Sequence, residues 1–115
     1  MLTRDTILQS DDLPREELYV PQWEDTVYVS ALTGAQREEF ELAAQRQSDG
    51  DMTTLDLIAL LATETLTDDK GEHLFTREDA PALKDKNAAA LLLIGETALR
   101  VNALTNADLE DIQGE

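Results

Sequence analysis

Hydrophobic and polar residues alternate in two short stretches near the start of the chain. Leu18 and Val20 alternate with polar or aromatic neighbours, and Val27 and Val29 repeat the pattern after a short gap. A period of two is typical of a strand with one buried face. Pro21 has no N–H to give to a sheet, so the first strand should end there. The pattern predicts a β-hairpin over residues 16–31.

The spacing of apolar residues changes to that of a helix after the hairpin. Thr33 and Gln36 form the sequence signature of a capping box, in which each side chain binds the other residue's backbone N–H. We expect a helix over residues 33–47, ended by the turn-forming residues 48–51. Its buried side would consist of Phe40, Ala43 and Ala44.

A second helix is indicated after this turn, capped by Thr53 or Thr54. Its helically spaced apolar residues are Leu55, Ile58, Ala59, Leu61 and Ala62. Residues 61–67 include β-branched residues in partial alternation, which leaves open whether the helix extends or frays there. A turn at residues 67–71, a bridge at residues 73–75 and a short helix capped by Thr76 should follow.

The last long helix has an apolar first half, residues 88–94. A helix without a polar face is normally enclosed by other elements, so we expect this one to be surrounded. It should begin at Asp85 or Lys86 and end near Val101. The residues suited to close packing or to C-capping are Gly95, Ala98 and Asn102.

The two ends of the chain differ from its body. Residues 1–15 carry one short apolar patch, Ile7 and Leu8, and are predicted to form a helical turn or a loose arm. Residues 108–115 form an acidic tail. The expected architecture over residues 1–115 is α+β: a single, mainly α-helical domain with an N-terminal two-stranded antiparallel β-hairpin.

The net charge and the absence of cysteine limit which partners, which chemistry and which cellular location the protein can have. The chain has 25 acidic and 9 basic residues and a net charge of −16. This charge disfavours nucleic acid and anionic membranes as partners and favours a basic protein, although solubility alone is an alternative explanation. No cysteine is present, which excludes disulfides and thiol chemistry. With no signal peptide and no long apolar run, we expect a soluble cytoplasmic protein.

The sequence offers no residue set for catalysis. His73, beside Glu72, is the single histidine and is most simply a surface residue. Residues 49–51 and 68–72 place oxygens in turns, but they lack the glycine and glutamate spacing of an EF-hand. We therefore predict a protein that is not an enzyme, with no catalytic, cofactor-binding or metal-binding residues; a weak cation site is the lesser alternative.

Three aromatic side chains of the hairpin are the best candidates for binding a partner. Trp23 lies in the predicted loop, and Tyr19 and Tyr28 fall on the face opposite Val20 and Val29. An exposed aromatic pair beside a sheet edge is a common way to receive another chain. The alternative is that both tyrosines are half-buried against the protein's own helices.

Four groups of residues follow one another along the chain. They are Val20-Pro21-Gln22-Trp23 with Val27-Tyr28-Val29; Leu32-Thr33-Gly34 with Arg37 and Phe40; residues 71–76 with Asp79; and Asn87-Ala88-Ala89-Ala90 with residues 98–105. In this order, in a small acidic chain, they resemble the tail assembly chaperones of long-tailed, siphovirus-type bacteriophages and prophages. The resemblance covers nearly the whole chain. It departs from the family at Glu24 and Asp25, where a basic or glycine residue is usual, and residues 48–60 match loosely.

The resemblance implies a non-enzymatic role in building the phage tail. Members of this family bind the tape measure protein, keep it soluble, help to recruit tail tube subunits and are absent from the mature virion. This chain would be the short form, with a longer form made by a programmed frameshift, and would act in the host cell cytoplasm. The hypothetical partner-binding residues are Tyr19, Trp23, Tyr28, Phe40, Leu91 and Ile94.

Two other functions fit the same sequence. One is a small acidic regulator or nucleic-acid mimic that blocks a basic host protein, as the charge allows. The other is a structural head–tail connector, which would be found in purified particles. The sequence leaves open whether the protein forms a homo-oligomer, whether a longer product exists and which surface binds a partner.

Overall fold

The structure is a computed structural model that describes residues 1–48 and 53–104. Its elements, in chain order, are α1 (Arg4–Gln9), β1 (Arg15–Val20), the 3₁₀ turn η1 (Pro21–Trp23), β2 (Asp25–Ser30), α2 (Gly34–Ser48), α3 (Thr54–Thr65), β3 (Leu66–Thr67), the 3₁₀ turn η2 (Arg77–Asp79), α4 (Ala80–Lys84) and α5 (Ala88–Val101). The expected α+β class with an N-terminal hairpin is confirmed. The turn predicted at residues 48–51 falls largely, and the acidic tail at residues 108–115 entirely, outside the described residues.

The hairpin carries a third strand that the sequence pattern did not predict. β1 and β2 pair antiparallel, from Arg15 opposite Ser30 to Val20 opposite Asp25. β3 then pairs antiparallel with β2, so that β2 is the central strand of three. The extra strand is only two residues long and follows α3 directly, which is why no separate period of two marks it.

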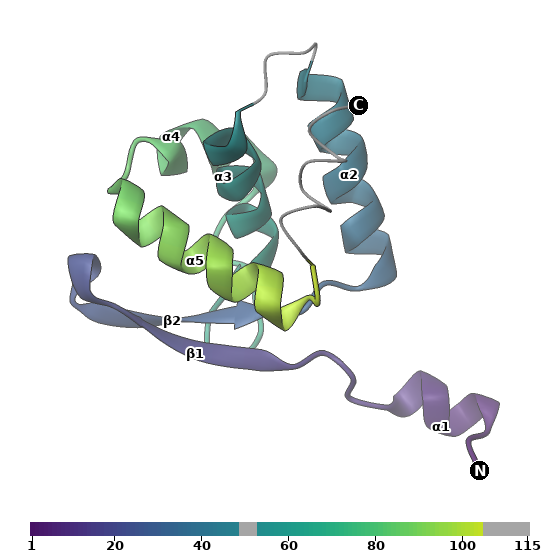
Figure 1. The fold of residues 1–115 in the computed structure, drawn as a ribbon. Coiled ribbons are helices and arrows are strands. Elements are labelled where there is room, and N and C mark those ends of the chain that lie inside the picture. The colour runs from purple at the N-terminus through teal and green to yellow at the C-terminus, as the bar shows by residue number, and fades with distance from the viewer. Residues whose placement is uncertain (49–52, 105–115) are drawn as a thin grey trace.

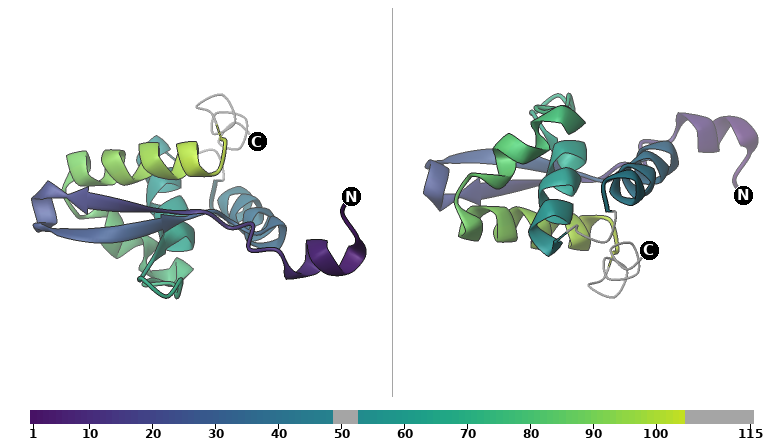
Figure 2. Two further views of the ribbon diagram at one scale, coloured as in Figure 1. Left: turned by 90° about the horizontal axis from the view of Figure 1, so that it is seen from below. Right: turned by 90° about the horizontal axis from the view of Figure 1, so that it is seen from above.

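Apart from α1, the helices lie on one face of this sheet (Figure 1). Seen from below, the two long strands lie in front of the helices (Figure 2). The residues that face the helices alternate along both strands, and Val20 and Val29 are fully buried among them. None of the described helices therefore covers the opposite face of the hairpin.

The enclosed helix is α3 rather than α5. Residues 57–63 are buried in succession, because α3 contacts α2, α4, α5 and β2. α5 packs against α3, β1 and β2 but keeps an outer face, on which Leu92 is 51% exposed. The prediction that residues 88–94 are surrounded is wrong, since the sheet and α3 cover only one side of this helix. Apolar composition did not distinguish an enclosed helix from one with an exposed apolar stripe.

Capping interactions fix where the helices begin. Thr33 and Gln36 exchange the predicted capping-box bonds, at 2.9 and 3.0 Å. Thr53, one of the two candidates, caps α3 together with Asp56. α5 starts slightly later than expected, because Asn87 accepts from the N–H of Ala90 and so defines the N-cap.

The end of α5 is closed by two backbone bonds. Asn102 is the C-cap, as predicted, and Ala103 follows it with a φ of 54°. Leu104 N–H donates to Leu99 O at 2.8 Å, and Ala103 N–H donates to Arg100 O at 3.2 Å. These two bonds define a Schellman motif, which usually has glycine at the position of Ala103.

Candidate functional site

The hairpin tip turns the single tryptophan back toward the helices. Pro21 ends β1, and η1 follows directly, as the position of the proline predicted. Glu24 then adopts a left-handed conformation with a φ of 54°, and its N–H donates to Pro21 O at 3.2 Å. The turn leaves the Trp23 side chain half-buried against the core.

An apolar groove opens beside Trp23, between the hairpin tip and α4. Its volume is about 380 Å³, within the usual range for ligand pockets of roughly 300–1,000 Å³. It is lined by Trp23, Phe75, Asp79, Ala82, Leu83 and Lys86, which we call the tip groove. A concave, mainly apolar surface with one acid and one base among its lining residues suits an apolar side chain presented by another protein.

The two tyrosines occupy a different surface, the uncovered face of the hairpin. Tyr19 stands opposite Thr26 and Tyr28 opposite Glu17, so the rings are diagonal neighbours rather than a directly opposed pair. Tyr19 is 57% exposed, whereas Tyr28 is half-buried. Both tyrosine rings face away from the helices. The structure therefore does not support the alternative in which they are half-buried against those helices.

Arg15 holds Tyr28 and the neighbouring turn in place. Its guanidinium carbon lies 5.7 Å from the centre of the Tyr28 ring, within the range of a cation–π contact. The same side chain donates to the backbone O of Asp69 at 2.9 Å. Asp68 accepts from the N–H groups of Glu72 and Lys70, and these two bonds hold the pKa of its carboxyl below the ordinary value. This end of the sheet face therefore holds a turn whose backbone groups are hydrogen-bonded to the side chains of Arg15 and Asp68.

Three of the six hypothetical partner-binding residues belong to the core instead. Phe40, Leu91 and Ile94 are fully buried, with exposures of 0%, 1% and 0%. Phe40 lies on the inner side of α2, and the other two lie on the side of α5 that meets α3 and the sheet. Their side chains offer no surface to a partner in this conformation. The large hydrophobic residue of α5 that is exposed is Leu92.

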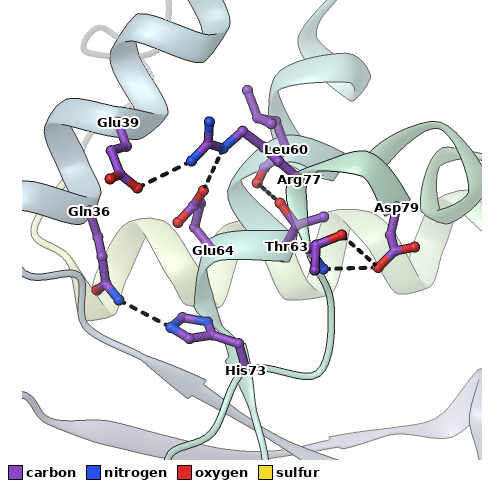
Figure 3. Close-up of polar contacts among 9 residues, drawn as sticks. Gln36, Glu39, Leu60, Thr63, Glu64, His73, Arg77 and Asp79 are labelled. Atoms are coloured by element: carbon purple, nitrogen blue, oxygen red, sulfur yellow. Dashed lines mark hydrogen bonds and ion pairs between the residues drawn. The ribbon is translucent and has the colours of Figure 1, made fainter.

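Polar side chains between the helices form hydrogen bonds and ion pairs that connect α2 to α3 and to the loop before η2. Arg77 joins two helices, with Nε donating to Glu64 at 3.2 Å and a terminal nitrogen donating to Glu39 at 3.1 Å (Figure 3). Gln36 Oε1 already accepts from Thr33, so its Nε2 donates to Nε2 of His73 at 3.1 Å. His73 thereby ties its loop to α2.

Two features are absent from the part of the chain that the structure describes, a metal-binding cluster and a membrane-spanning helix. Within residues 1–48 and 53–104, no group of three or more histidine, aspartate or glutamate side chains is placed to hold a metal ion. No helix in those same ranges is long and apolar enough to cross a membrane. The residues that stand out are those of the tip groove and the tyrosine face.

The fold itself matches a known phage protein. The structure of the bacteriophage HK97 tail assembly chaperone aligns with this chain at a TM-score of 0.58, covering 84% of this chain and 94% of that one, with 13% sequence identity. This is the fold of a tail assembly chaperone. No protein-family model and no curated protein sequence matches the chain. The resemblance noted in the sequence is thus confirmed at the level of the fold.

Sequence reasoning identified part of the tip groove and missed the rest. It singled out Trp23, but not Phe75, Ala82, Leu83 and Lys86, which come from a loop and helix more than 50 positions later. Phe75 is half-buried next to the exposed Leu74, and this local alternation is the available signal. Nothing in the sequence indicates that η2 and α4 return to the hairpin tip.

Proposed function

We propose that this chain is a phage tail assembly chaperone, in the short form, that binds the tape measure protein and helps to recruit tail tube subunits around it. The observation that carries the proposal is the fold shared with the HK97 tail assembly chaperone over 84% of this chain. The protein would act in the host cell cytoplasm and would be absent from the finished virion. It would have no enzymatic activity.

The tip groove is the described surface best suited to a tape measure helix. In helix-in-groove recognition, large apolar residues of one helix face enter a concave apolar surface. Phe75 and Leu83 supply apolar walls beside Trp23, and Asp79 and Lys86 add one acid and one base for polar contacts. The tyrosine face lies beside the outer edge of β1, which pairs with no strand of the described residues. Together they suit a second, extended segment of a partner such as the tube subunit.

Capture of tape measure fragments by variants of this chain tests the proposal. Ala82→Glu places a charge in the groove at an exposed position and leaves the core untouched. The new carboxylate would have to lose its water when an apolar helix enters the groove, so we expect captured fragment to fall at least about tenfold. Ala89→Glu, at an exposed alanine of α5 outside the groove, is the matched control and should capture normally.

Each outcome of this capture has a distinct meaning. If Ala82→Glu captures as much as the control, the groove is not the site; Tyr19→Ala with Tyr28→Ala then tests the tyrosine face. If the unaltered chain captures no tape measure fragment, the chaperone function is refuted. Detection of the chain in purified virions would favour a connector instead.

The net charge of −16 favours one other function, an acidic regulator that blocks a basic host protein. The two functions differ in their dependence on salt. Binding through opposite charges weakens steeply as salt rises, whereas an apolar helix in the groove is retained. A gene neighbourhood containing tube and tape measure genes would support the chaperone, and one beside a restriction or repressor locus would support the regulator.

A further inference from the structure

A second pocket lies at the end of the hairpin far from its tip. Arg15 and Ser30 form the strand pair most distant from the turn, and the pocket opens beside them with a volume of about 350 Å³. We call it the strand-end pocket, and its hydrogen-bond donors come from the side chains of Arg15, Ser30, Thr67, Lys70 and His73. Unlike the tip groove, it is surrounded mainly by polar groups.

The strand-end pocket gathers positive charge in a strongly acidic chain. Arg15 and Lys70 line it, although the chain has only 9 basic residues against 25 acidic ones. Asp11 is the single acid among its described lining residues. Two bases and one acid leave one net positive charge while His73 is neutral. The pocket therefore suits a group that carries a single negative charge.

His73 presents an unused donor in the wall of this pocket. The Oε1 atom of Gln36 accepts from the Thr33 N–H, so its Nε2 donates to Nε2 of His73 at 3.1 Å (Figure 3). Neutral His73 must then carry its proton on Nδ1. This Nδ1–H has no acceptor among the described residues.

A buried pair of hydroxyls in the same lining also has a donor to spare. Ser30 and Thr67 are only 8% and 2% exposed, and their hydroxyl oxygens lie 2.7 Å apart. One of the two hydrogens makes the bond between them. The other finds no acceptor among the described residues, whereas buried polar groups are normally paired. The pair therefore points to an acceptor supplied from outside the chain.

Arg15 is held at the pocket before any ligand arrives. Its Nη1 donates to the backbone O of Asp69 at 2.9 Å, and its guanidinium lies over the Tyr28 ring. Gly71 has a φ of 85° and lets the turn pass close by, since a Cβ there would come 3.4 Å from Nη1. The other guanidinium nitrogens bond to no described residue. A planar guanidinium held in this way can donate two parallel bonds to a carboxylate.

We propose that the strand-end pocket binds one carboxylate on an aliphatic stem, presented by the C-terminus or by an acidic side chain of a partner protein. The unused groups are all donors, and one net positive charge matches a carboxylate better than a doubly charged phosphate. Leu13 and Ala31 complete the lining and offer apolar contacts to the stem. The inference goes beyond the function proposed above and does not rest on it.

Titration of the full chain with short peptides tests the pocket without any tape measure protein. The chain has a single histidine, so the ring-proton NMR signals of His73 are unambiguous. An acetylated tetra-alanyl-leucine peptide with a free C-terminus should shift these signals to saturation, with a dissociation constant of about 1 mM. The same peptide with an amidated C-terminus should leave them in place. An amidated peptide with one internal glutamate tests the side-chain source, and binding of either carboxylate supports the proposal.

Variants of equal charge separate a local contact from the field of the whole molecule. Lys70 is exposed, and its side chain makes no bond to a described residue, so Lys70→Glu should keep the fold and weaken peptide binding at least about tenfold. Lys70→Arg should retain binding. Arg46→Glu changes the net charge as much as Lys70→Glu, but at an exposed position about 15 Å along α2 from Gln36. It should bind the peptide normally.

Four results would overturn the proposal. The first is the absence of any shift with either carboxylate peptide. The second is an equal shift with the amidated peptide, which would show an apolar contact alone. The third is equal weakening in Arg46→Glu and Lys70→Glu, which would show long-range attraction only. The fourth is tighter binding of inorganic phosphate at the same ionic strength, which would show a general anion site.

Discussion

At the residue scale, α5 has a glycine in its interior and an alanine at the end, where a helix more often has glycine. Gly95 lies in the middle of the helix, where a Cβ would come within 3.0 Å of Ile58 Cγ2. The glycine therefore serves the close approach of α3 that its position in the sequence suggested. Ala103, at the end of the same helix, has a φ of 54°, a conformation that favours glycine.

Ala103→Gly should stabilise the protein by about 0.5–1 kcal/mol. The substitution removes the strain of a left-handed alanine and keeps the backbone bonds from Leu104 to Leu99 and from Ala103 to Arg100. Urea denaturation followed by the fluorescence of Trp23 measures the change. Ala103→Val should shift the midpoint the other way, because a β-branched residue tolerates this conformation poorly. A loss of stability in Ala103→Gly would contradict this account of the helix end.

At the scale of elements, α3 is joined to α4 through the carboxyl of Asp56. This residue completes the capping box with Thr53, and its Oδ1 lies 2.6 Å from Nζ of Lys84. The hydrogen bond from Lys84 and, next to it, that from the Thr53 N–H lower the pKa of Asp56 from its ordinary 3.8. The folded protein thus stabilises the ionised form of Asp56.

Asp56→Ala should lower the free energy of unfolding by about 1 kcal/mol at neutral pH, chiefly because the N–H and hydroxyl of Thr53 lose the carboxylate that accepts from them. Because the folded pKa is lowered, this contribution is present above the unfolded pKa and is lost as pH falls through the folded value. The difference between the two proteins should therefore be constant above about pH 5 and shrink in more acidic solution. Urea denaturation at a series of pH values measures it.

Lys84→Met is the control for this prediction. It removes the exposed partner of the ion pair and leaves the cap intact, so it should cost only about 0.5 kcal/mol. The free energies of unfolding of Asp56→Ala and the unaltered protein could instead differ by the same amount throughout the acidic range. That result would show that the Asp56 carboxyl is not bound in its charged form.

Elements with local signals could be predicted from the sequence, and those defined by tertiary contact could not. The hairpin, the Thr33–Gln36 box and the cap at Asn102 all rest on interactions among neighbouring residues. β3 depends on β2, which lies far away in the sequence, and the exposed side of α5 depends on where α3 and the sheet happen to lie. For the candidate site, Trp23 was found through its hairpin, whereas Phe75 and Leu83 reach it only through the path of η2 and α4.

At the scale of the whole molecule, the net charge of −16 makes salt a test of how a partner is held. The Debye length falls from about 10 Å at 0.1 M salt to about 3 Å at 1 M, so interactions between exposed charges, but not apolar contacts, fade over that range. Capture of an apolar tape measure helix in the tip groove should therefore persist as sodium chloride rises, and capture at several concentrations of salt measures this. Capture that weakens steeply with salt would mean that opposite charges hold the two proteins together.

The place of Trp23 in the wall of the tip groove makes occupancy of the groove visible without a label. Trp23 is the single tryptophan of the chain, and it lines the groove together with Phe75 and Leu83. An apolar helix seated beside it should shift its emission to shorter wavelength, so a titration with a client helix reports the fraction of grooves that are filled.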